Sequence, residues 1–257
     1  AVSPDTLSLI NNALDREKPD LVIFTGDQIK GYSKKFKKDP AIIESTIDIL
    51  VEPIAKRNIP FMVTYGNHDA QCGIDNRGQY KFYAKYDNFI SGDLRNSDDV
   101  GTADIQIYSS TEDKPVFELY IIDSHGKAKD GAGYAPVDKK QIEWYVSRRE
   151  QLKAENGGYL PSLVFQHIPV PEFFDVIKKV PKGTKGAVPA YGAHENEYFV
   201  LNDETIAEGG FMLESPASPD VNTGEFEAMS EKGDVLGIYV GHDHNNSFVV
   251  KYKGVDL

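Results

Sequence analysis

Short, largely apolar runs separated by helix-forming segments constrain the fold of this chain more than any other feature. Continuous apolar runs of this kind are typical of strands that are buried on both faces of a sheet. They occupy residues 21–25, 61–64, 162–166 and 235–240, and further strands are expected at 105–110, 116–123 and 247–252. Apolar residues at helical spacing occur at 4–18, 40–55 and 138–155. The alternation predicts an α/β fold with parallel strands joined by helical crossovers.

The length and composition fit one large globular domain or two small ones, and we expect residues 1–257 to form a single domain that is truncated at the N-terminus. The chain is 40% hydrophobic, and its 28 basic and 40 acidic residues give a formal net charge of −12. Such a field disfavours nucleic acid and anionic membranes. A phosphorylated substrate would therefore need a local positive centre, such as a metal cation. No apolar run reaches the roughly 18 residues of a membrane-spanning helix, and the single cysteine, Cys72, excludes an intramolecular disulfide.

Polar residues that can bind metals follow four of the expected strands. In parallel α/β sheets, ligands lie at the carboxyl ends of the strands. One such residue would be explained by turn formation alone, but four in the same relation favour a metal site. Carboxylate, amide and imidazole donors suit Mn, Fe or Zn. The candidates are Asp27, Asn67, His68 and Asp69, His167, and the pair His242 and His244.

These motifs resemble those of the calcineurin-like metallophosphoesterases. The matching blocks are Gly26-Asp27, Gly66-Asn67-His68-Asp69, a lone His167, and Gly241-His242-Asp243-His244, in that order. The stretches KPDLVIFTGDQI and FQHIPVPEF look most like the subgroup related to purple acid phosphatases. The resemblance implies a four-layer α/β/β/α sandwich of two mixed sheets. It also implies hydrolysis of phosphoesters, most readily monoesters of small molecules, by a metal-bound hydroxide at a dinuclear site.

The resemblance also implies a role for each residue. Asp27 would bridge two divalent cations, His244 would bind the second of them, and the first would be completed by Asn67, His167 and His242. His68 would donate to the substrate from outside the metal ligands, with Asp69 orienting its ring. Lys30 stands where purple enzymes carry a tyrosine ligand to ferric iron, so a divalent pair (Mn, Fe or Zn) is expected.

The first block of the family pattern, D-x-H, is missing ahead of Asp27. Residues 1–26 contain no histidine, and we expect the motif, and any signal peptide, upstream of Ala1. Asp123-Ser124-His125 matches D-x-H formally but lies between the wrong blocks. These residues are expected at the rim of the pocket, the alternative being a rearranged second metal site.

Two other functions remain open at this stage. A phosphodiesterase or nuclease would use the same chemistry, although the net charge of −12 speaks against long nucleic acids. A non-catalytic binding module of the same fold is the other alternative, and the missing D-x-H block is its support.

Overall fold

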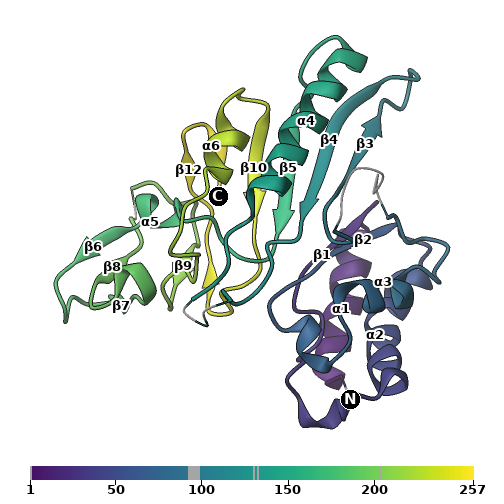
Figure 1. Cartoon of the computed structure of the whole chain (residues 1–257), viewed down its shortest axis with the longest axis horizontal. Helices are drawn as coiled ribbons and strands as arrows, with labels where there is room; N and C mark the ends of the chain where they lie inside the picture. Colours follow the sequence, from purple (N-terminus) through teal and green to yellow (C-terminus); the bar gives the residue numbers. More distant parts are fainter. Residues whose placement is uncertain (1, 92–98, 130, 132, 203) are drawn as a thin grey trace.

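The computed structural model describes residues 2–91, 99–129, 131, 133–202 and 204–257. The N-terminal part contains two parallel strands in register, β1 (Val22–Thr25) and β2 (Phe61–Thr64). Figure 1 shows this pair together with three helices at the same end of the molecule. They are α1 (Pro4–Glu17), α2 (Pro40–Ala55) and α3 (Asn76–Tyr83), with short 3-10 turns η1 (Lys34–Phe36) and η2 (Asp69–Cys72) in the loops.

The larger sheet has six strands in the order β12-β13-β10-β5-β4-β3. Its centre is parallel, whereas β3 and β12 run antiparallel to their neighbours, so the sheet is mixed. The strands are β3 (Ala103–Tyr108), β4 (Pro115–Ile122), β5 (Ser162–Gln166), β10 (Val235–Tyr239), β12 (Lys251–Tyr252) and β13 (Val255–Asp256). The segment expected as one strand at 247–252 is thus two short strands, β11 (Asn246–Ser247) and β12, in different sheets.

Three apolar clusters define four layers. Residues of α2 and α3 pack on one face of β1 and β2, and α4 (Lys139–Asn156) and α6 (Glu225–Ser230) pack on one face of the larger sheet. Met62 of β2 and Ile121 of β4 meet between the two sheets. The side chains of β4 alternate accordingly, with Tyr120 and Ile122 facing the α4 side. The predicted α/β/β/α fold is therefore confirmed. The smaller sheet is all parallel in the part of the chain that is described.

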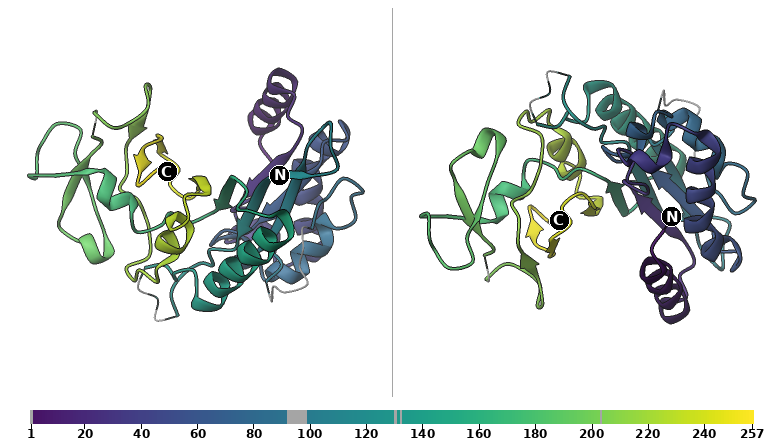
Figure 2. Two further views of the ribbon diagram at one scale, coloured as in Figure 1. Left: turned by 90° about the horizontal axis from the view of Figure 1, so that it is seen from above. Right: turned by 90° about the horizontal axis from the view of Figure 1, so that it is seen from below.

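The segment between β5 and β10 lies at the end of the molecule far from α1, as the two views of Figure 2 show. Long loops were expected over 181–225, but short strands occur there. A three-stranded antiparallel sheet has the order β6-β8-β7, and β9 pairs with β11. The elements are α5 (Phe173–Val176), β6 (Lys178–Val180), β7 (Val188–Pro189), η3 (Gly192–His194), β8 (Tyr198–Val200) and β9 (Phe211–Met212).

Helix α1 is the most exposed of the long helices. Ser3 caps it and Pro4 occupies its first turn, as its sequence predicts. Of its residues only Leu14 is buried, and Leu9 is 70% exposed.

Across the described residues, no helix combines the length and apolar character that a membrane crossing requires.

One buried carboxylate ties the end of β1 to the end of β2. Asp69 is fully buried, and its Oδ2 accepts hydrogen bonds from the backbone N–H groups of Asp27 and Gly66, both at 2.8 Å. Its Oδ1 accepts from the N–H of Ile29 at 3.3 Å. Burial, the largest influence, raises the pKa of Asp69 to about 7, against the opposing effect of these donors. The loops that carry Asp27 and Asn67 are therefore fixed to each other.

Replacing Asp69 should destabilise the fold in proportion to the donors left unpaired. Asp69→Ala removes all three acceptor contacts and should lower the free energy of unfolding by at least about 3 kcal/mol. Asp69→Asn can keep the two contacts of Oδ2 and should lose less. Urea denaturation of both variants measures the difference. Equal losses in the two variants would show that the contacts do not act as described.

A second buried carboxylate predicts how stability depends on pH. Glu118 of β4 is 1% exposed and lies beside Asp104 of β3, which accepts a hydrogen bond from Arg148 Nε at 2.9 Å. Burial and the neighbouring negative charge of Asp104 raise the pKa of Glu118 to about 9, from an ordinary value of 4.5. The folded chain therefore retains a proton that the unfolded chain releases between these values.

The free energy of unfolding should consequently fall as the pH rises from about 5 to about 9. Glu118→Gln should flatten this dependence, because glutamine carries no titrating proton. Glu112→Gln, at an exposed position between β3 and β4, is the matched control and should keep the slope of the original chain. Denaturation at a series of pH values tests this, and identical slopes for all three proteins would contradict it.

Candidate metal centre

Four of the residues predicted as metal ligands come together where strands of both sheets end. Asp27 follows β1, Asn67 follows β2, His167 follows β5 directly, and His242 follows β10. Both strand pairs that carry them are parallel, so the carboxyl ends of each pair lie at one edge. The N–H of Gly241 also donates to His167 O at 3.1 Å, which holds the β10 loop against the β5 loop.

The four donor atoms lie close together, and those of Asp27, His167 and His242 are all within 4.8 Å of one another. His167 Nε2 lies 3.1 Å from Asn67 Oδ1, 3.2 Å from Asp27 Oδ2 and 3.1 Å from His242 Nδ1. Metal–ligand distances of about 2.0–2.2 Å place neighbouring ligands about 3.0–3.5 Å apart. The spacing therefore suits one shared cation.

The hydrogen bonds around the cluster leave lone pairs that a shared cation could use. His167 Nδ1 lies 2.9 Å from Thr25 O, so this nitrogen carries a proton and donates to the carbonyl. Its Nε2 is then free to act as a ligand, an arrangement typical of metal-binding histidines. Asp27 Oδ2 is buried, and His167 Nε2 lies 3.2 Å from it. Several acceptors that converge in a buried space repel one another unless a proton or a cation lies between them, so this donor set fits a metal.

Two glycines let the backbone approach the cluster. A Cβ at Gly66 would lie 2.3 Å from Asp27 Oδ1, and a Cβ at Gly26 would lie 2.6 Å from His167 Nδ1. Asp27 itself has a positive φ of 54°, which is uncommon for a residue with a side chain. Its Oδ1 accepts from the N–H of His68 at 2.7 Å, which leaves Oδ2 for the cluster.

The electrostatics of the cluster favour one neutral imidazole and one that holds a proton. Burial, followed by the charge of His167, lowers the pKa of His242 to about 4, so its ring is neutral. Burial also acts to lower the pKa of His167, but contacts with Asp27 and Thr25 O outweigh it and the pKa is raised. For Asp27, burial raises the pKa, yet the hydrogen bond and charge of His167 and the His68 N–H produce a net lowering. A cation would take the place of the proton on His167.

His244 does not join this donor group. Among the described residues, two groups could hold a cation: Asp27, His167 and His242, and separately Asp99, Asp123 and His125. His244 is exposed and belongs to neither. Its assignment to a second cation therefore stays a prediction.

Asp123 is buried and does not lie at the pocket rim, where it was expected. It is 2% exposed, and its carboxylate accepts from Asn76 Nδ2 at 2.7 Å and from the N–H of His125 at 2.9 Å. The expectation of a rim position for Asp123 is therefore wrong, because the segment after β4 packs beneath α3. His125 is partly exposed and has a positive φ of 62°. The alternative in which Asp123 and His125 join His244 is not what the structure shows.

His68 lies beside the cluster, but its ring partner differs from the expectation. Its Nδ1 lies 2.9 Å from Gln71 Oε1, and its ring packs against Tyr32 with centroids 4.6 Å apart. Lys30 Nζ lies over the Tyr32 ring, 5.0 Å from its centroid. Asp69 does not orient His68, because its two oxygens are occupied by backbone donors.

Sequence reasoning missed Gln71, Tyr32 and Tyr134. Gln71 is three residues from His68 in a 3-10 turn, a spacing that could have indicated the contact. Tyr134 packs its ring against His242, with centroids 4.6 Å apart and planes at 81°. Tyr134 comes from the connection between β4 and α4, and no sequence signal pointed to it.

Comparison with known proteins agrees with this geometry. The family model described as calcineurin-like phosphoesterase matches residues 3–246. The chain belongs to this family.

Its relatives include purple acid phosphatase-like proteins. It is 27% identical to "Probable inactive purple acid phosphatase 14" of Arabidopsis thaliana, over 98% of this chain and 60% of the relative. It is 30% identical to "Phosphatase DCR2" of Saccharomyces cerevisiae, over 96% of this chain and 40% of that protein. The chain thus spans about 60% or less of these relatives. A solved dimetal phosphatase from Danio rerio has the same fold, with a TM-score of 0.59 at 12% identity, over 98% of this chain and 75% of that one.

Metal binding by the four-residue cluster should stabilise the fold. A divalent cation at one hundred times its Kd should add about 2.7 kcal/mol to the free energy of unfolding. Thermal unfolding with and without added Mn²⁺ or Zn²⁺ measures this. His242→Ala should lose most of the shift, whereas His194→Ala, whose ring stacks on Phe174, should keep it. An undiminished shift in His242→Ala would place the metal elsewhere.

Proposed function

We propose that this chain forms the catalytic domain of a metal-dependent phosphoesterase that acts most readily on phosphomonoesters of small molecules. The convergence of Asp27 Oδ2, Asn67 Oδ1, His167 Nε2 and His242 Nδ1 carries the proposal. Family membership supports it, because the family's model is described as a phosphoesterase.

The four residues would hold one divalent cation, with Mn, Fe or Zn as the suitable metals. When bound, such a cation neutralises phosphate charge and lowers the pKa of a water ligand to about 7. A second cation would use Asp27 together with His244. The chain's own excess of negative charge makes the cation the positive centre that attracts a phosphate.

His68 would act on the substrate from beside the metal. Its Nδ1 donates to Gln71 Oε1, so the ring orientation is fixed and Nε2 is left for the substrate. A protonated Nε2 can donate to the leaving oxygen as the phosphorus–oxygen bond breaks. Tyr32 packs on the ring and limits its movement.

A non-catalytic phosphate-binding module is the second candidate function. Its support is that His244 lies outside the donor groups of the described residues and that plant relatives carry the word "inactive" in their names. Metal analysis together with turnover of p-nitrophenyl phosphate and bis-p-nitrophenyl phosphate separates the candidates. Hydrolysis of the monoester supports the first candidate, preference for the diester supports a phosphodiesterase, and metal binding without turnover supports the module.

Replacing His68 should reduce turnover while sparing the metal. His68→Ala should lower kcat by about 10²–10⁴-fold on a monoester with a poor leaving group. Gln71→Ala removes only the partner of the ring and should lower kcat less. Lys34→Ala, an exposed position in η1, should leave it unchanged. Steady-state kinetics and metal content of the purified variants test this, and full activity in His68→Ala would rule out the assigned role.

A further inference from the structure

A cavity of about 350 Å³ lies next to the metal centre. Its wall is formed by the segment after β4, the start of α5, the turn at 191–194 and the segment 214–220. Tyr134 lines the cavity and also packs edge-on against the ring of His242. Asp243, the residue after His242, lines it as well. The cavity and the metal centre therefore share a wall.

The segment 213–217 is fixed to the loop that carries His242. The N–H of Ala217 donates to Asp243 Oδ1 at 3.1 Å, and the N–H of Asn245 donates to Glu214 Oε1 at 2.7 Å. Pairing of β9 with β11 extends this attachment. The cavity thus keeps its position relative to the metal ligands.

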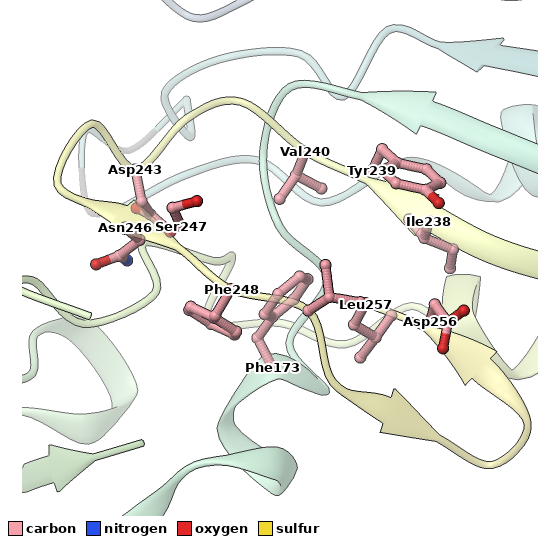
Figure 3. Close-up of a pocket in the computed structure, with 11 residues that line it drawn as sticks. Phe173, Ile238, Tyr239, Val240, Asp243, Asn246, Ser247, Phe248, Asp256 and Leu257 are labelled. Carbon is pink, nitrogen blue, oxygen red and sulfur yellow. The ribbon is translucent and has the colours of Figure 1, made fainter. Parts of the chain in front are cut away.

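Figure 3 shows a second cavity behind the same loop, of about 230 Å³. Asp243 lies at one end of it, and Phe173, Phe248 and Leu257 lie farther along. Its lining is mostly apolar and includes none of the predicted metal ligands. Because Asp243 lines both cavities, the loop after β10 separates them.

The first cavity, by contrast, combines negative charge with aromatic faces. Among the described residues, three carboxylates line it and no lysine or arginine does. The imidazole of His194 also lines it and faces Glu197, with Nδ1 to Oε2 at 2.9 Å. The carboxylates belong to Glu214, Asp220 and Asp243, and the aromatic side chains to Tyr134, Phe174 and Tyr191.

Ser215 and Asp220 both line the cavity. Ser215 is only 4% exposed. Asp220 uses Oδ1 to accept from the N–H of Ala193 at 2.7 Å, and its Oδ2 accepts from no described residue. Tyr191 is 72% exposed at the cavity and offers a free ring face.

We infer that this cavity binds an organic ammonium group on the alcohol portion of the substrate. The inference rests on the proposed function, because it assigns the substrate class of the same site. A cation is attracted both by carboxylates and by the faces of aromatic rings. The same carboxylates repel an alcohol portion that carries its own negative charge. The phosphate is held by the metal, and the ammonium group by the adjacent cavity.

Binding of choline tests the cavity without relying on catalysis. Its neutral isostere, 3,3-dimethylbutanol, has the same shape and no charge. Calorimetry on the metal-loaded chain should show choline binding about 5- to 30-fold more tightly than the isostere. Asp220→Asn keeps the acceptor for Ala193 and removes the charge, so the preference should fall several-fold. Glu112→Gln, remote on the β3–β4 connection, should leave it unchanged.

Kinetics then separate this inference from the proposed function. Phosphocholine should have a kcat/KM about 5- to 30-fold above that of 3,3-dimethylbutyl phosphate. Asp220→Asn should reduce this ratio of the two kcat/KM values. Hydrolysis of both esters at equal rates, with no preferential binding of choline, would overturn the inference and leave the phosphoesterase standing. Preferential choline binding without hydrolysis of either ester would overturn the phosphoesterase and retain the cation-binding cavity.

Discussion

The buried carboxylate of Asp69 is the contact on which the rest of the site depends. By accepting backbone N–H groups from both strand ends, it sets the distance between the β1 loop and the β2 loop. That distance places Asp27 beside Asn67, and it leaves the His68 N–H positioned to donate to Asp27 Oδ1. These hydrogen bonds offset part of the cost of burying the charge, and burial still raises the pKa of Asp69 to about 7. A residue expected to assist His68 instead holds the metal-binding loops together.

The two sheets contribute different types of donor to the candidate metal centre. The oxygen donors Asp27 and Asn67 follow strands of the smaller sheet, and the imidazoles of His167 and His242 follow strands of the larger sheet. Packing of β2 on β4, through Met62 and Ile121, holds the two sheets together. A second link is the bond from His167 Nδ1 to Thr25 O, which crosses from one sheet to the other. The centre therefore depends on the packing between the sheets as much as on the loops themselves.

Most of the fold and the first donor set could be predicted from the sequence. The continuous apolar strands and the helical segments between them required a covered sheet, and the polar residue after each strand marked the edge where ligands meet. The partner of His68 could not be predicted in the same way, because Asp69 and Gln71 are both near it in sequence. Only the backbone path shows that the Asp69 carboxylate turns inward and the Gln71 side chain turns toward the ring. The two short strands that replaced the expected strand at 247–252 likewise depend on partners distant in sequence.

The sequence by itself determined the types of donor, their order and their placement at strand ends, because these follow from local patterns of apolar and polar residues. The tertiary structure decided which donors share a point, since that depends on packing between segments as far apart as Asp27 and His242. It also separated His244 from the donor group and buried Asp123 beneath α3. The cavity beside Tyr134 is likewise a product of packing, because its walls come from four segments that no local pattern connects.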